Sequence, residues 1–183
     1  KINFPPEHED MHTLWANAYA RNNYSDKSLS ARILHKTHAL IENDFPSGTY
    51  FKDVIEVGAG SGAHIQFVRH DFDKYLMSDA GDEILSSAQI PDSLSQKVEI
   101  CQADATALQY PDDSFDRLIA THVLEHLAQP ELVLQEWVRV IRPGGVLSII
   151  LPCDPGMAWR IGRAFGPRKA GKEAGLPYDY YMA

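Results

Sequence analysis

Short apolar runs alternate with polar, helix-forming stretches along most of the chain. Five runs have the length and the β-branched or aromatic content of buried strands, and they lie at about 53–57, 74–78, 97–101, 115–120 and 146–151. Helical spacing of apolar residues predicts crossover helices near 62–70, 82–88 and 130–140. Arg142-Pro-Gly-Gly145 ends the last of these helices. The alternation predicts an α/β fold, a parallel sheet with helices on both faces.

The first fifty residues have a different, helical pattern. Residues near 12–20 and 28–43 predict two helices, and Pro46 and Gly48 end the second one before the first strand. We therefore expect three parts: a helical cap over residues 1–50, a core over 51–152 and a tail over 153–183.

The first strand leads directly into three closely spaced glycines, in the run Val54-Ile-Glu-Val-Gly-Ala-Gly-Ser-Gly62. Such spacing lets the backbone turn tightly beneath a ligand. Gly58, Gly60 and Ala63 also satisfy the G-x-G-x-x-G/A spacing of dinucleotide-binding turns, and Asp79 lies near the position of a ribose-binding acid. The glycines alone therefore leave NAD binding open.

Glu56 favours a different ligand. It is an acid two residues before the first glycine, where it would repel a pyrophosphate bound over the turn. S-adenosylmethionine has no phosphate and carries an ammonium and a sulfonium. An acid at this position can accept hydrogen bonds from the amino group, directly or through water. We therefore expect S-adenosylmethionine as the cofactor, with NAD as the alternative.

Further motifs follow the glycine run in order: Tyr75-Leu-Met-Ser-Asp79, then Val98 to Ala105, then Phe115 to Leu127, then Glu136 to Gly145. Together they resemble, over about residues 35–152, the class I S-adenosylmethionine-dependent methyltransferases, within them the small-molecule type with a type 11 domain. The resemblance implies a Rossmann-like, doubly wound sheet of order 3-2-1-4-5. It also implies methyl transfer to a small-molecule or lipid-like acceptor by in-line SN2 displacement.

The resemblance assigns a cofactor-binding role to residues at the ends of the predicted strands, namely Glu56, Gly58, Ala59, Gly60, Ser61, Gly62, Asp79, Ala80, Asp104, Ala105, Thr121 and His122. Asp79 should accept hydrogen bonds from both ribose hydroxyls, although it could instead cap a helix ahead of Glu83. Ala80 should pack on the adenine. Asp104 should accept the adenine amino hydrogen, while the amide of Ala105 addresses a ring nitrogen.

Methyl transfer from a sulfonium needs alignment more than a special catalytic residue. A hydroxyl acceptor would benefit from a base, and the candidates are His126, His122 and Tyr19, with Tyr24 as another cap tyrosine. His126 stands among apolar neighbours and fits a packed structural histidine equally well. The cap aromatics, Trp15 included, are expected either to close over the cofactor or to pack on the sheet.

Two histidine patterns resemble zinc motifs. His8-Glu-Asp-Met-His12 matches H-E-x-x-H, but prolines and acids surround it and no third ligand is evident. His122-Val-Leu-Glu-His126 matches the inverted motif, but its first histidine closes a predicted strand rather than lying on a helix. We expect no metal site.

Composition and charge narrow the functional classes. The chain has 183 residues, 44% of them hydrophobic, which suffices for one core, and it lacks an eighteen-residue apolar span. No signal peptide is evident, so we expect a cytoplasmic protein, and Cys101 and Cys153 are expected to lie too far apart for a disulfide. The net charge of −8 disfavours nucleic-acid binding.

The tail differs from the rest. Residues 156–183 carry five basic and two acidic side chains, a net charge of +3 that leaves −11 elsewhere. Its interleaved basic and aromatic residues could recruit an anionic or lipid-like substrate, or could form a solvated segment. No strand pair is evident there, whereas the family normally continues with a sixth and seventh strand. We expect a longer natural chain, because a missing hairpin leaves the fifth strand as an exposed edge. A noncatalytic module that binds the cofactor also stays open.

Overall fold

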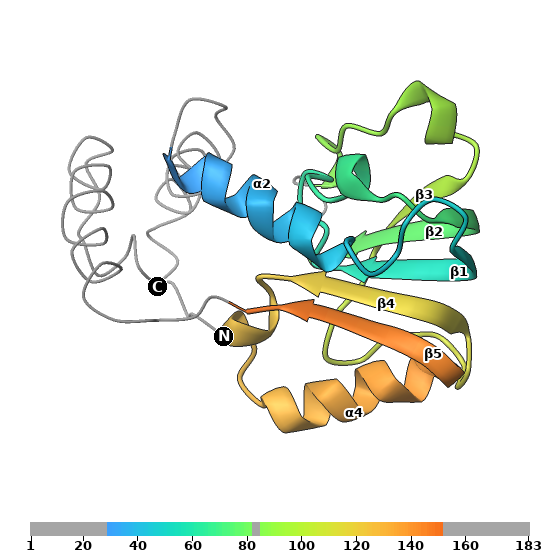
Figure 1. Ribbon diagram of the computed structural model, residues 1–183. Coiled ribbons are helices and arrows are strands. Elements are labelled where there is room, and N and C mark those ends of the chain that lie inside the picture. Colours follow the sequence, from blue (N-terminus) through green and yellow to red (C-terminus); the bar gives the residue numbers. More distant parts are fainter. Residues whose placement is uncertain (1–28, 82–84, 152–183) are drawn as a thin grey trace, which may run out of the picture. The chain divides into compact units, whose positions relative to one another are not determined.

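The computed structural model describes residues 29–81 and 85–151, which form a five-stranded parallel sheet (Figure 1). The strand order is β3-β2-β1-β4-β5, which confirms the predicted doubly wound fold. The elements are α2 (Leu29–Ile41), β1 (Tyr50–Val57), η2 (Ile65–Phe67), β2 (Asp71–Asp79), η3 (Asp92–Leu94), β3 (Val98–Gln102), β4 (Phe115–Thr121), η4 (Leu124–His126), α4 (Pro130–Val140) and β5 (Ile141–Ile150).

The parallel register brings the carboxyl ends of all five strands to one edge of the sheet. Val57 pairs with Ser78 and with Ala120. Asp79 pairs with Gln102 and Thr121 with Ile150. Ligands of open α/β sheets bind outside this edge, at the point where the strand order reverses. That point lies between β1 and β4, and the glycine turn directly follows β1.

The two faces of the sheet have different chemistry. One face packs against the buried stripe of α4, formed by Val133, Trp137 and Val140, and is apolar. On the other face the apolar core is joined by fully buried Glu56 and Arg117. Side chains alternate between the faces of a strand, so neighbouring residues of β1 and β4 lie in these two environments.

The prediction of a helix at 62–70 is wrong. After the glycines the chain makes turns and the three-residue 3-10 helix η2, then becomes extended at Val68. The reason is the distance to be covered. The nine residues of β2 span about 30 Å, whereas nine residues of α-helix span about 13 Å. A helix between Gly62 and Asp71 could not return the chain to the start of β2.

The bounds of the other helices and strands lie closer to the predicted ones. The helix expected at 28–43 is α2, and α4 has the expected bounds. Part of the helix expected at 82–88 and all of the one at 12–20 lie outside the described residues. β5 begins earlier than expected. Arg142 to Gly145 form a bulge inside it, because Phe115 pairs with Ile141 but Arg117 with Val146.

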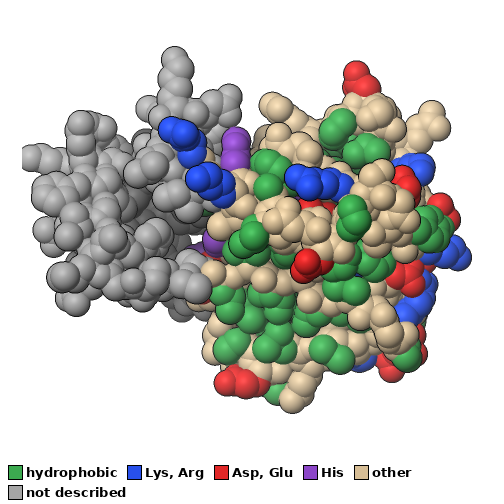
Figure 2. Space-filling view, in the orientation of Figure 1, with side chains coloured by type: hydrophobic (Ala, Val, Ile, Leu, Met, Phe, Trp, Pro, Cys, Tyr) green, Lys and Arg blue, Asp and Glu red, His purple; other side chains and the backbone are tan. Residues whose placement is uncertain are grey.

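β5 is an edge strand of the described sheet, and apolar side chains gather over β5 and α4 on the visible face (Figure 2). Within residues 29–81 and 85–151, no helix is long and apolar enough to span a bilayer. Cys101 is a free thiol that lies 3.3 Å from the hydroxyl of Tyr110. Cys153 lies outside the described part of the chain.

Candidate functional site

The backbone of the glycine turn has a conformation that residues other than glycine rarely adopt. Gly58, Gly60 and Gly62 have φ angles of +69°, +54° and +77°. The amide of Ala59 donates to the carbonyl of Ser78 at 2.9 Å, so the turn is tied to the end of β2. The turn therefore keeps a fixed shape at the carboxyl edge.

Crowding adds a second requirement for glycine. A Cβ at Gly58 would collide with the side chain of Val123, and one at Gly62 would lie 2.7 Å from Cε of Met77. At these two glycines the backbone is consequently packed against Val123 and Met77.

Asp79 ends β2 with its carboxylate against the glycine turn. One oxygen accepts a hydrogen bond from the amide of Gly60 and the other from the amide of Gly81, both at 2.9 Å. Each oxygen keeps a second lone pair. The structure thus brings Asp79 and the turn together. Its ribose contact stays a prediction, and Glu83, which the helix-cap alternative involves, lies outside the described residues.

The segment after β3 forms the neighbouring part of the edge. Asp104 is exposed, and its Oδ1 accepts hydrogen bonds from the amide and the hydroxyl of Thr106 at 2.8 and 2.7 Å. The carbonyl of Ala105 accepts the indole N–H of Trp137 at 2.8 Å, which anchors this loop to α4. The carbonyl of Ala80 accepts a hydrogen bond from the side-chain amide of Gln102 at 2.8 Å. The predicted adenine contacts stay predictions.

Glu56 lies beneath the turn rather than on its surface. Its side chain is 1% exposed, and one carboxylate oxygen accepts the hydroxyl of Tyr75 at 2.8 Å. Burial raises the pKa of Glu56, and nearby Glu42 and Asp79 add to this, against the opposing effects of His64 and Tyr75. The contact expected with an amino group stays a prediction, and Tyr75 is a partner that the sequence analysis missed.

The turn after β4 holds the candidate bases. His122 has a φ of +58°, and its Nε2 lies 3.3 Å from the hydroxyl of Thr37. Its Nδ1 lies 3.7 Å from Glu125, whereas the side chain of His126 is 61% exposed. Thr121 is buried at the end of β4. The structure therefore places His122, rather than His126, inside the carboxyl edge.

The zinc alternatives receive no support from the described residues. His122 lies outside any helix, and His126 ends the short η4, so the two do not share a helical face. Residues 29–81 and 85–151 contain no group of three or more His, Cys, Asp or Glu placed to hold a metal. The pattern at His8 and His12, like Tyr19, Tyr24 and Trp15, lies outside them.

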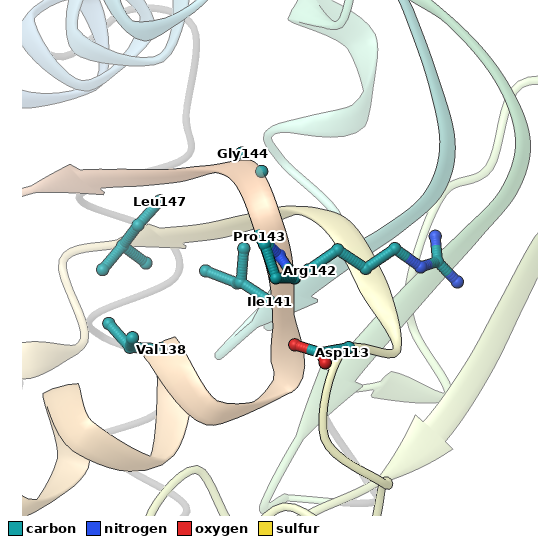
Figure 3. Close-up of a pocket in the computed structure, with 8 residues that line it drawn as sticks. Asp113, Val138, Ile141, Arg142, Pro143, Gly144 and Leu147 are labelled. Atoms are coloured by element: carbon teal, nitrogen blue, oxygen red, sulfur yellow. The ribbon is translucent and has the colours of Figure 1, made fainter.

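A pocket of about 410 Å³ lies away from this site (Figure 3). It is lined by Asp113, Val138, Ile141, Arg142, Pro143, Gly144, Gly145 and Leu147. These residues belong to the end of α4, the bulge of β5 and the loop before β4. They lie toward the amino ends of the strands, so the pocket is not part of the carboxyl-edge site.

Comparison with known proteins gives the same family as the motifs. A family model described as a methyltransferase domain matches residues 55–149. The 2-methyl-6-phytyl-1,4-hydroquinone methyltransferase 1 of Oryza sativa subsp. japonica is 33% identical over 104 residues, which cover 56% of this chain and 31% of that protein. The phosphatidylethanolamine N-methyltransferase of Cereibacter sphaeroides is 30% identical over 104 residues, 53% of this chain and 49% of that protein.

Solved structures share the fold. A candidate S-adenosyl-L-methionine-dependent methyltransferase from Methanococcus maripaludis superposes with a TM-score of 0.60 at 19% identity, and the match covers 90% of this chain and 68% of that one. This likeness concerns the fold alone. The chain spans less than half the length of the two curated relatives named above.

Proposed function

Because the chain belongs to the methyltransferase domain family of the class I, S-adenosylmethionine-dependent type, we propose that it binds S-adenosylmethionine at the carboxyl edge of its sheet. We further propose that it transfers the methyl group to a small-molecule or lipid-like acceptor. The observation that carries this proposal is the Asp79 carboxylate held 2.9 Å from the amide of Gly60, beside three glycines of positive φ.

The geometry fits the cofactor in two ways. Gly58, Gly60 and Gly62 leave the turn without side chains at three positions of positive φ, so a ligand could approach its backbone closely. Asp79 is already oriented by Gly60 and Gly81, so its remaining lone pairs can accept two ribose hydroxyls. Asp104 and the Ala105 amide would then address the adenine, and Thr121 and His122 would face the cofactor from β4.

Bound S-adenosylmethionine supplies a methyl group that is already activated as part of a sulfonium. The chain's own residues then have to align the acceptor, exclude water and receive a proton where the acceptor loses one. His122 is the candidate for the last role, because it lies at the carboxyl edge with Glu125 near its Nδ1. A lowered pKa of Glu125, which His122 and His126 produce against the effect of burial, keeps that carboxylate charged.

The acceptor class is supported by the relatives. One is named for a phytyl hydroquinone and another for phosphatidylethanolamine, which are both lipid-like molecules. The tail of this chain combines basic with aromatic side chains, a composition suited to anionic or lipid-like ligands. We propose that residues 153–183 form part of the substrate side and residues 51–152 the cofactor side.

Calorimetry tests the cofactor assignment. The wild-type protein should bind S-adenosylhomocysteine and not NAD, whereas binding of NAD alone would overturn the proposal. Asp79→Asn should weaken S-adenosylhomocysteine binding by about 10- to 100-fold, because charge-assisted hydrogen bonds are lost. The matched control is Asp71→Asn, at the exposed amino end of the same strand, which should bind as the wild type does.

The acceptor class is tested by transfer of a labelled methyl group. The substrates are a demethylated quinol and phosphatidylethanolamine vesicles, each compared with water-soluble phenols and amines. Transfer to a lipid-like substrate supports the assignment. Binding of S-adenosylhomocysteine without transfer to any acceptor would favour the noncatalytic module.

A further inference from the structure

A cluster of buried polar side chains lies on the face of the sheet opposite α4. It consists of His38, Glu42, His64, Arg117 and Ser148, each at most 6% exposed, and we call it the buried polar cluster. The cluster joins the end of α2 to β4, to β5 and to the segment that follows the glycine turn. None of these residues has a role in the methyl transfer proposed above.

An ion pair forms the centre of the cluster. Arg117 contacts both carboxylate oxygens of Glu42, at 2.8 and 3.1 Å, and both side chains are fully buried. The Nε of Arg117 donates to the hydroxyl of Ser148 at 3.1 Å. The guanidinium also lies 4.1 Å from the ring centre of Phe45. Glu42 and Arg117 thereby hold each other in one orientation.

His64 connects the glycine turn to this ion pair. Its Nε2 lies 3.0 Å from Glu42, and because a carboxylate only accepts, Nε2 carries the proton. Its Nδ1 lies 3.2 Å from Nδ1 of His38. Burial would raise the pKa of Glu42, but the hydrogen bonds from His64 and Arg117 outweigh it and lower the pKa to about 2. Glu42 is therefore a charged acceptor at neutral pH.

The position of His64 in the chain indicates what its contact with Glu42 does. His64 follows Gly62 by two residues, in a segment that forms turns and the three-residue η2 instead of an α-helix. An α-helix would fix the exit of the turn through its own backbone hydrogen bonds. Here η2 has no side-chain cap, and the buried side chain of His64 provides an anchor instead.

We propose that His64 is a positioning residue for cofactor binding, which holds the exit of the glycine turn through Glu42 and Arg117. The inference rests on the proposed function, since it concerns the same cofactor site. It predicts that the affinity for S-adenosylhomocysteine depends on a side chain that the cofactor does not touch.

The test compares S-adenosylhomocysteine dissociation constants by calorimetry. His64→Leu and His64→Asn, which lose the donor to Glu42, should raise the constant about tenfold or more. His64→Gln places an amide N–H near the position of Nε2 and should restore affinity to within about threefold. The matched control is His70→Leu. His70 is also buried, but its Nε2 has no hydrogen-bond partner among the described residues, and affinity should not change.

The outcomes separate the two proposals. If His64→Leu and His64→Asn lower the melting temperature but bind S-adenosylhomocysteine as the wild type does, His64 is merely structural and the inference is overturned. If His64→Leu does not fold, the difference between the Asn and Gln variants decides. A wild-type protein that binds no S-adenosylhomocysteine would instead overturn the proposed function itself.

Discussion

The two faces of the sheet bury different kinds of side chain. On the α4 face, Trp137, Val133 and Leu118 are buried with other apolar side chains, and one indole hydrogen bond is the polar contact of Trp137. On the opposite face, Glu42 and Arg117 are buried as a charged pair, and His64 joins them. Both faces belong to the same strands, so backbone geometry does not explain the difference.

The difference teaches what each face contributes. Apolar side chains of similar volume can replace one another in a core. The α4 face therefore stabilises the fold without requiring a particular pair of residues. A buried ion pair is costly to desolvate and is often no more stable than apolar residues of the same size. The charged face is therefore better explained by positioning than by stability, in agreement with the contact of Glu42 with His64, two residues after the glycine turn.

Breaking the ion pair should have the largest effect. Glu42→Leu leaves Arg117 buried without its carboxylate and should lower the free energy of unfolding by about 3–5 kcal/mol. The double variant Glu42→Leu with Arg117→Met should recover most of that loss, because no charge stays buried. Urea unfolding measures both. A double variant as unstable as the single one would contradict this account of the charged face.

The apolar face should lose less from one substitution that keeps an aromatic ring. Trp137→Phe removes the indole donor to Ala105 and some volume, and should cost about 1–3 kcal/mol. Val138→Ala, at an exposed position of the same helix, should change stability by less than about 0.5 kcal/mol. Chemical denaturation of both variants measures the difference, and equal losses would show that Trp137 is not a core anchor.

The charged face should also respond to pH. Burial, with Arg117 nearby, lowers the pKa of His70 below its usual 6.5, so the folded state favours the neutral ring. The contribution to stability is complete above pH 6.5 and is lost as the pH falls toward and through the folded pKa. Wild-type stability should fall between pH 7.5 and 5.5 by at most about 1.4 kcal/mol per pH unit from this group. His70→Leu should flatten that slope in thermal unfolding followed across pH.

An exposed ion pair should matter least. Lys74 lies 2.8 Å from Glu99, with side chains 46% and 61% exposed. Lys74→Met should change the free energy of unfolding by less than about 0.5 kcal/mol, and added salt should reduce even that. A loss comparable to that of Glu42→Leu would mean that burial does not separate the two kinds of pair.

The strands could be predicted from the sequence because apolar runs and their spacing are local properties. The glycine turn and Asp79 were also predictable, since parallel strands bring their carboxyl ends together. The turn region after Gly62 was not. Its helical pattern is local, but the distance back to the start of β2 is set by the sheet, and the sheet excluded the helix.

The buried polar cluster shows the same limit. Arg117 inside the apolar strand Phe115–Thr121 was a signal, because a buried cation needs a partner. Its partner, Glu42, is 75 positions away in the sequence and directly follows α2, so the local pattern did not indicate the pairing. Glu56 was predicted to accept hydrogen bonds from the cofactor's amino group, but its hydrogen bond from Tyr75 on the neighbouring strand could not be inferred from the sequence.

The contact between Gly58 and Val123 restricts the order in which this protein can change over evolutionary time. Replacing Gly58 first would force a methyl group into Val123, so that variant is blocked until Val123 has become smaller. Even then the φ of +69° penalises any L side chain. Crowding by Val123 and the positive φ therefore both disfavour any other residue in place of Gly58. A laboratory selection that varies one site at a time should retain glycine there.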